Sequence, residues 1–398
     1  MQRLATNGAV DMADPIRDAV QQRIPAMNEM RTKLHAMPEL GFEETTTAKY
    51  IADKLHAAGI EVHTGIGKTG VVGVLQSATP GPRLMIRADI DGLPVIEQTG
   101  LEFASQNGNM HACGHDGHIT MALQAAEILS DMKADLKGSV VFAFQPAEEI
   151  VSGALAMEAD GLFERWKSDR VIGTHLWNQL PTGFVGVNRG TVFASADAIR
   201  VEVTGKGGHG AMPHLTVDPV AIAAQIVATA QTIVSRELPP NEMGVVTFGQ
   251  IHGGSAPNVI ADNVIVEGTV RAYKPEIREQ IFASLKRITS NVASAMRGTA
   301  RFEQLYGAPP VVNDPDVASW TAGIAAQVVG EENVDETPPV SVGDDMAEFL
   351  NRVPGTYFLL GAAKQGTEGH HNARFDFDPA CLPTGTEIFV RSTVDYLS

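Results

Sequence analysis

The spacing of apolar residues changes along the chain, and the expected secondary structure changes with it. Between positions 14 and 60 apolar residues recur every three or four positions, which predicts two helices, the second ending at Gly59. Runs rich in Val, Ile, Leu and Phe follow, and helical spacing returns between them. The expected strands are 71–76, 83–91, 139–149 and 170–178, and the helices between them are 118–132 and 152–164. This alternation predicts an α/β domain with a largely parallel sheet flanked by helices.

A different order of elements begins near residue 192. The pattern predicts a half-exposed strand, a long amphipathic helix, a pair of strands, a second helix and a last strand; these are 196–208, 216–237, 243–254 with 261–273, 274–296 and 299–307. Helical 319–330 and strand-like 354–363 then resume the first pattern. We therefore expect an inserted α+β domain over 192–308, within a domain formed by 1–191 and 309–398.

Composition narrows the class of protein. A chain of 398 residues with 44% hydrophobic and 19% charged residues is typical of a globular protein with two domains. A formal net charge of -17 argues against non-specific binding of nucleic acid. No run of about 18 uncharged apolar residues or signal-type segment occurs, so we expect a soluble cytoplasmic protein that does not bind membranes. Only two cysteines, Cys113 and Cys381, indicate a reducing compartment and separate roles.

Groups able to bind a metal or move a proton gather where the predicted strands end. They are Asp89 and Asp91, Glu148 and Glu149, and His175. The segment HACGHDGH, residues 111–118, directly precedes a predicted helix over 119–132. Because open α/β sheets place their sites at the carboxyl ends of strands, we expect these groups to converge on one edge.

Within HACGHDGH, Cys113 and His115 offer thiolate and imidazole donors two residues apart, which predicts a transition-metal site. On spacing alone, any of His111, His115 and His118 is eligible as the ligand. The alternative for Asp116 and His118 is that they cap the following helix.

The adjacent side chains of Glu148 and Glu149 diverge, so they need different roles. One is suited to bind metal, and the other to take a proton from the bound water. The alternative for this pair is a solvated acidic loop.

Seven motifs in order, RADIDGLPV, HACGHDGH, FQPAEE, THLWN, GKGGHGAMPH, GGSAPNVIADN and HHNARFDFD, cover nearly the whole chain. Together they resemble the hippurate hydrolase and auxin-conjugate amidohydrolase branch of the aminoacylase-type metallopeptidases. The resemblance implies a dinuclear metal centre, with Glu148 as the base that activates a bridging water. The donor types suit Zn²⁺ and leave Mn²⁺ and Co²⁺ open. The implied ligands are Cys113, His115, Glu149, His175 and His371. It also implies that the insert is a lid and dimerisation domain, and hence a homodimer or higher homo-oligomer.

Further roles follow from the same resemblance. His209 matches the lid histidine that polarises the scissile carbonyl, reaching the site of a neighbouring subunit, and Asn258 and Arg271 match positions that hold the substrate carboxylate. Asp91 matches an aspartate that orients or tunes a group beside the metal, whereas Asp89 stands where relatives carry a metal-binding histidine.

Two further positions carry open alternatives. His370 and His371 compete for one ligand position, and His371, next to Asn372, fits the family pattern better. Arg271 on a strand has the alternative of an exposed salt-bridging residue.

The expected reaction is hydrolysis of an N-acyl amino acid, hippurate-like or with an acetyl or longer acyl group, to a carboxylate and the free amino acid. A dipeptidase or carboxypeptidase activity of the same family is the nearest alternative. Two glycine-rich stretches, 65–70 and 205–210, match G-x-G-x-x-G and raise the alternative of a nucleotide-binding protein. Neither opens a predicted helix, so we interpret the first as a turn between strands. A binding or sensing module without catalysis is the third alternative.

Overall fold

The computed structural model describes residues 14–398, and its largest element is a mixed sheet of eight strands. In spatial order these are β1 (Glu61–Ile66), β2 (Gly70–Gln76), β4 (Lys137–Gln145), β3 (Thr79–Asp89), β5 (Arg170–Trp177), β16 (Gly355–Gly361), β6 (Val185–Gly186) and β15 (Val334–Asp335). Strands β4, β3, β5 and β16 run parallel to one another, while β1 and β2 pair antiparallel with their neighbours. Strand β6 pairs antiparallel with β16 and parallel with β15. The expected α/β class with a mostly parallel mixed sheet is confirmed.

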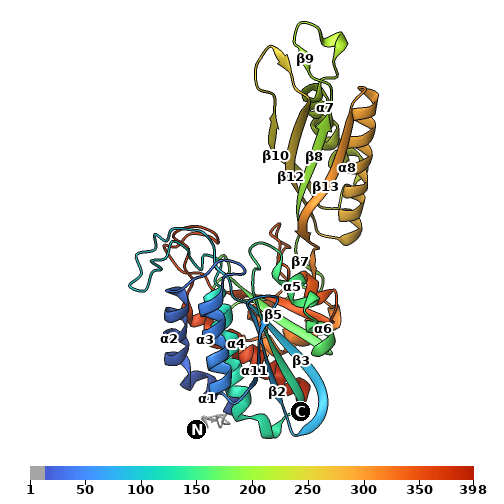
Figure 1. Ribbon diagram of the computed structural model, residues 1–398. Coiled ribbons are helices and arrows are strands. Elements are labelled where there is room, and N and C mark those ends of the chain that lie inside the picture. The colour runs from blue at the N-terminus through green and yellow to red at the C-terminus, as the bar shows by residue number, and fades with distance from the viewer. Residues whose placement is uncertain (1–13) are drawn as a thin grey trace, which may run out of the picture.

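Helices cover both faces of this sheet (Figure 1). One face packs against α1 (Pro15–Gln22), α2 (Ile24–His35), α3 (Thr45–Ala57), α4 (His115–Asp131), α9 (Pro315–Val329) and α11 (Leu382–Leu397). The other face packs against α5 (Gly153–Ala159), α6 (Leu162–Arg165) and α10 (Met346–Leu350). Alternate residues of one strand enter the two cores, as Val71 and Val72 do, which explains the continuous apolar runs in the sequence.

The N-terminal helical pattern is divided differently from the prediction. Where the apolar spacing predicts one helix before residue 41, α1 ends at Gln22 and α2 begins at Ile24. Pro25 lies in the first turn of α2, where its missing N–H and its ring are tolerated. In the middle of a continuous helix the same proline would clash with the carbonyl of Gln21.

Residues 196–308 form a small unit of their own. Its antiparallel sheet has the order β10 (Gly244–Gly253), β12 (Asn263–Ala272), β8 (Ala196–Thr204) and β13 (Thr299–Ala308). Helices α7 (Pro219–Thr232) and α8 (Pro275–Ala295) pack on one face. The short strands β9 (Gly208–His209) and β11 (Val259–Ile260) pair at the end farthest from the large sheet (Figure 1). The order of elements is the one that the sequence pattern predicts.

The connection between the two units is a second short pair, β7 (Thr191–Phe193) with β14 (Val311–Val312). The first glycine-rich stretch forms the turn between the antiparallel strands β1 and β2, as interpreted from the sequence. Among residues 14–398, no helix is long and apolar enough to cross a membrane.

A buried ionic network joins α2 to α4. His35 Nδ1 lies 2.9 Å from Asp116 Oδ2, and its Nε2 lies 3.2 Å from Glu97 Oε1. Arg31 contacts Asp116 at 3.4 Å and also Asp376, near the C-terminal end of the chain. Burial lowers the pKa of His35, but its hydrogen bonds and the charges of Asp116 and Glu97 outweigh burial and raise it to about 9. The network therefore holds a protonated histidine that links α2, α4 and the loop that carries Glu97.

This arrangement predicts a pH-dependent contribution of His35 to stability. With an unfolded pKa of 6.5 and a folded pKa of about 9, the stabilisation is fully present below pH 6.5 and is lost as the pH rises through 9. Its size is on the order of 3 kcal/mol. Urea unfolding of His35→Gln and wild type should show a gap in unfolding free energy at pH 6 that shrinks towards pH 10. The exposed His214→Gln is the control, and an equal gap for His35→Gln at both pH values would contradict the assignment.

Candidate metal centre

Helix α4 begins earlier than the sequence pattern predicts, so the second half of HACGHDGH belongs to the helix. The expected start was residue 119, but the helix starts at His115, so Asp116 and His118 lie inside its first turn. Gly114 precedes it with a φ of 94°, a left-handed conformation that turns the chain into the helix. The proposed capping role is wrong, because no side chain caps α4. Asp116 instead belongs to the network with His35 and Arg31.

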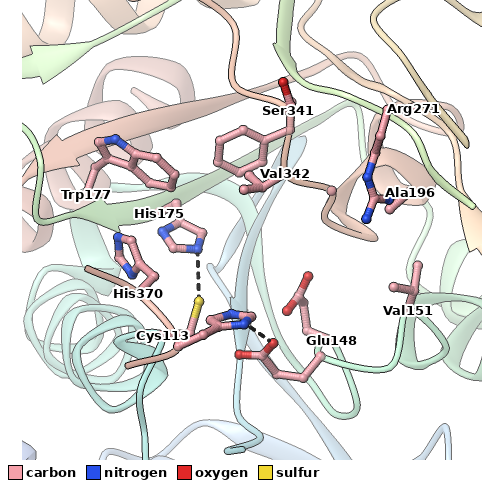
Figure 2. Close-up of a pocket in the computed structure, with 14 residues that line it drawn as sticks. Cys113, Glu148, Val151, His175, Trp177, Ala196, Arg271, Ser341, Val342 and His370 are labelled. Atoms are coloured by element: carbon pink, nitrogen blue, oxygen red, sulfur yellow. Dashed lines mark hydrogen bonds and ion pairs between the residues drawn. The ribbon is translucent and has the colours of Figure 1, made fainter. Parts of the chain in front are cut away.

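The five ligands implied by the resemblance lie together at the carboxyl end of the sheet. Figure 2 shows two of them, Cys113 and His175, side by side. Potential ligand atoms lie within 4.8 Å of one another in five groups. Three of them combine the implied ligands, and they are Cys113 with His115 and His175, Cys113 with Glu149 and His371, and His115 with Glu148 and Glu149. The other two are Asp89 with His115 and His118, and Glu148 with Asp344 and Asp345. Cys113 Sγ is 3.5 Å from His175 Nε2, and His371 Nε2 is 3.3 Å from Glu149 Oε2. Cys113 thus lies between two overlapping sets of donors, an arrangement able to serve two ions.

One nitrogen of each central histidine bonds to a backbone carbonyl, and the other faces the cluster. His115 Nδ1 donates to the carbonyl oxygen of Asp91 at 2.9 Å, and His115 Nε2 has no hydrogen-bond partner. His175 Nδ1 donates to the carbonyl oxygen of Leu176 at 2.7 Å, which leaves its Nε2 facing Cys113. Glu149 Oε1 is also buried without a hydrogen-bond partner. Buried polar atoms are seldom without a partner, so the unpartnered His115 Nε2 and Glu149 Oε1 are suited to bind a metal ion.

The structure separates the competing histidines of HHNARFDFD and HACGHDGH. His371 belongs to one of the ligand groups, whereas His370 belongs to none among residues 14–398. The ring of His370 lies between those of Trp177 and Phe375, with centroids 4.8 Å away on each side. His111 is buried and also lies outside the groups found in residues 14–398. The geometry therefore favours His371 over His370, and His115 over His111.

The two aspartates make hydrogen bonds within the protein: Asp91 to the ligand candidates, and Asp89, which is grouped with His115 and His118, to His118 and Arg87. Asp91 Oδ2 accepts from the backbone N–H of Glu149 at 3.0 Å, while the Asp91 carbonyl orients His115. Asp89 is fully buried, and its two oxygens contact His118 Nδ1 at 2.5 Å and Arg87 Nη1 at 2.6 Å. Asp91 thus fixes two of the predicted ligands, which agrees with an orienting role.

Three charged residues that no sequence motif predicted lie beneath the cluster. Arg87 is buried and donates to Asp89, Asp344 and Asp345, and the last two are grouped within 4.8 Å of Glu148. One signal was available: Arg87 is a lone cation in the apolar part of a strand predicted to be buried. The aspartates carry no such signal, because an acidic pair before a short helix is common on protein surfaces.

The cluster holds more negative charge than its own cations balance. Burial raises the pKa of Glu148 well above its usual range, and the charges of Asp344 and Glu149 raise it further. Burial likewise raises the pKa of Glu149 to about 8, although His115 opposes this shift. Burial and the charge of Glu149 also raise the pKa of Cys113. A bound cation would lower all three pKa values, because it would offset the negative charges and stabilise the deprotonated groups.

A cavity of about 470 Å³ opens over these groups, and the small unit contributes to its wall. Arg271, on β12, lines the cavity together with Cys113 and Glu148 (Figure 2). It is half-buried, and among residues 14–398 no carboxylate forms an ion pair with it. The alternative of a salt-bridging surface residue is therefore not what the geometry shows. Arg271 is a free cation facing the acidic cluster.

The structure does not bring the other two lid residues to this cavity. His209 lies exposed on β9, and the carbonyl of Asn258 accepts a hydrogen bond from the Gly210 N–H beside it. Both belong to the far end of the small unit (Figure 1). They lie close to each other but away from Arg271 and the metal-binding candidates of the same chain.

Comparison with known proteins agrees with this arrangement. Residues 85–394 match the model of Peptidase family M20/M25/M40. The chain is 35% identical to a hippurate hydrolase of Campylobacter jejuni, covering 93% of this chain and 96% of the relative. It is also 35% identical to thermostable carboxypeptidase 1 of Saccharolobus solfataricus, covering 94% and 96%. A crystal structure of Bacillus subtilis YXEP protein, described as a dinuclear metal binding peptidase, superposes with a TM-score of 0.81 at 32% identity, covering 95% and 99%.

Removal of the Cys113 thiol should cost metal binding before it costs the fold. We expect Cys113→Ala to lower the affinity for Mn²⁺ or Co²⁺ by more than about 100-fold, because even partners outside the ligand set contribute 10- to 100-fold. Its thermal midpoint without metal should stay close to that of wild type, since the side chain is small. Calorimetric titration of the metal-free protein measures the affinity. Cys381→Ala, which removes the other buried thiol, should bind metal normally, and normal binding by Cys113→Ala would refute the assignment.

Proposed function

Because the chain belongs to Peptidase family M20/M25/M40, we propose that it hydrolyses the amide bond of N-acyl amino acids to a carboxylate and the free amino acid. Relatives named as hydrolases and amidohydrolases agree with a metal-dependent amide hydrolase. One observation carries the choice of substrate. The cavity over the donor cluster also holds Arg271, a cation without an acidic partner among residues 14–398, which suits the carboxylate of an amino acid.

Two divalent cations fit the cluster by charge and by donor type. The ligands proposed for them are Cys113, His115, Glu149, His175 and His371. Thiolate and imidazole donors favour Zn²⁺, and the carboxylates also accommodate Mn²⁺ and Co²⁺. When bound, such ions polarise the scissile carbonyl and lower the pKa of an attached water. The Bacillus subtilis structure described as dinuclear supports a pair of ions in this chain.

Glu148 is suited to the proton transfers of amide hydrolysis. It lines the cavity beside the ligand candidates, and burial together with the charges of Asp344 and Asp345 raises its pKa, so that its carboxylate is a stronger base than an exposed one. We assign it the base that takes a proton from the attacking water as the water oxygen bonds to the carbonyl carbon. It then gives this proton to the leaving nitrogen when the C–N bond breaks. Glu149, directed to His115 and His371, remains a ligand.

His209 and Asn258 are assigned to the same reaction from a second copy of the chain. Both lie at the far end of the small unit, which places them away from their own cavity (Figure 1). A homodimer or higher homo-oligomer formed through this unit would let His209 polarise the scissile carbonyl of its neighbour. Asn258 would then join Arg271 in holding the substrate carboxylate. The separation of Arg271 from the other two residues is the observation that supports this arrangement.

The second candidate is a carboxypeptidase or dipeptidase, which the Saccharolobus solfataricus relative favours. We expect protein reloaded with Zn²⁺, Mn²⁺ or Co²⁺ to release amino acid faster from N-acetyl, N-benzoyl or long-chain acyl substrates than from dipeptides with the same C-terminal residue. A free α-amino group needs its own acceptor in the cavity, which an acyl group does not. Amine release from matched pairs, such as N-benzoylglycine and glycylglycine, measures the difference. Faster cleavage of the dipeptides would favour the second candidate.

The role of Glu148 can be separated from metal binding. Glu148→Gln should retain two metal equivalents and lose more than about 100-fold in turnover, since general acid-base catalysis contributes 10²- to 10⁴-fold. Metal analysis and the N-acyl assay are made on the same sample. Near wild-type turnover by this variant would remove Glu148 from the mechanism.

Arg271 should act on substrates that carry a carboxylate. We expect Arg271→Met to raise KM for N-acyl amino acids about 10- to 100-fold, because hydrogen bonds to charged groups contribute 1.5–3 kcal/mol. For the corresponding N-acyl amino acid amides, wild type and variant should differ little. Initial rates on the paired substrates test this, and an equal effect on acid and amide would show that Arg271 does not bind the carboxylate.

A further inference from the structure

His118 uses both ring nitrogens in hydrogen bonds within the protein. Its Nε2 lies 2.9 Å from the backbone N–H of Leu176, and its Nδ1 lies 2.5 Å from Asp89 Oδ1. A backbone N–H can only donate, so Nε2 is the acceptor and the proton is on Nδ1, directed to Asp89. His118 is buried close to His115, but it has no lone pair left for a metal.

Asp89 is itself held in place. Its second oxygen accepts from Arg87 Nη1 at 2.6 Å, and Arg87 Nε donates to Gln145 Oε1 at 2.9 Å. Gln145 lies at the end of β4 and Asp89 at the end of β3. The Asp89 carboxylate that accepts from His118 is therefore anchored, through Arg87, to two adjacent parallel strands of the central sheet, a rigid support.

The other end of this chain of contacts reaches a proposed ligand. Leu176 directly follows His175, and its carbonyl oxygen accepts from His175 Nδ1 at 2.7 Å. The backbone of Leu176 is thus bound on its N–H side by His118 and on its carbonyl side by His175. His175 Nε2 consequently faces Cys113 Sγ at 3.5 Å. The rings of His118 and His175 are 5.1 Å apart and nearly perpendicular.

We propose that His118 and Asp89 form a positioning pair that fixes the backbone at Leu176 and thereby directs His175 Nε2 to the metal centre. The proposal rests on the metal centre of the proposed function, but it concerns how a ligand is held and not which substrate is cleaved. Residues that orient ligands from outside typically contribute 10- to 100-fold in metal affinity. It gives Asp89, which stands where the resemblance implies a histidine, a defined role.

Two substitutions separate the two hydrogen bonds of His118. In His118→Asn the amide nitrogen takes the place of Nδ1, so the bond to Asp89 is kept and the acceptor for Leu176 is lost. In His118→Gln the longer side chain brings an oxygen to the place of Nε2, so the acceptor is kept. We expect the Asn variant to bind Co²⁺ about 10- to 100-fold more weakly than wild type and with an altered visible absorption spectrum. The Gln variant should recover most of the affinity and the spectrum.

The measurement is a titration of metal-free protein with Co²⁺, followed by absorption. Gln124→Leu is the control, because it removes a buried amide from the same helix without touching the cluster. The proposal is overturned if the Asn variant binds Co²⁺ like wild type, or if the Asn and Gln variants weaken binding equally, which would indicate a packing role alone. Because substrate cleavage is not measured, failure of the proposed function would leave these outcomes unchanged.

A second measurement does not depend on the folding of any variant. Hydrogen–deuterium exchange of the Leu176 amide in metal-free wild type should be slow, as expected for a buried N–H bound to His118. Fast exchange at this amide, while neighbouring amides of β5 stay protected, would also overturn the proposal.

Discussion

Buried negative charge is the constraint on which the site depends. Asp89, Asp344 and Asp345 share one buried guanidinium, that of Arg87, and the carboxyl groups of Asp91, Glu148 and Glu149 lie around the same centre. Buried carboxylates that exceed their counter-charges either take up protons or bind cations. A pair of divalent ions would balance this excess and leave Glu148 able to exchange a proton. The charge that makes the metal-free cluster unfavourable is therefore what suits it to the proposed chemistry.

The support for the cluster is as important as its donors. Parallel strands β3, β4 and β5 end at the same edge and bring Asp89, Gln145 and His175 close together. The first turn of α4 lies across that edge and contributes His115 and His118 with different tasks, one with a free nitrogen and one with none. The three histidines of HACGHDGH thus have different places. His115 is a proposed metal ligand, His118 is a positioning residue, and His111 is buried outside the ligand groups found in residues 14–398.

Much of this could be predicted from the sequence, because strand ends and motif order are local properties. The alternation of strands and helices predicted the sheet. The side chains at the strand ends, among them Asp89, Glu148 and His175, were expected to converge on one edge. The start of α4 was misplaced: Gly114, whose left-handed turn leads the chain into the helix, packs beside Leu176 and Phe375, which the local sequence does not reveal. Asp344 and Asp345 were missed because the partners that draw them into the cluster, Arg87 for both and Gln145 for Asp345, lie 200 or more residues away in the sequence. The spacing of residues also cannot show that Arg271 meets the cavity while His209 does not.

The central claim is that two metal ions lie on either side of Cys113. Anomalous diffraction from crystals of the full chain grown with Mn²⁺ or Co²⁺ tests it most directly. The account predicts two anomalous peaks, both near Cys113 Sγ. The ligands His115, His175, Glu149 and His371 should be divided between the two peaks. His118 and Asp89 should bind neither ion. A single peak, or a peak bound by His118 or His370 in place of His115 or His371, would contradict it.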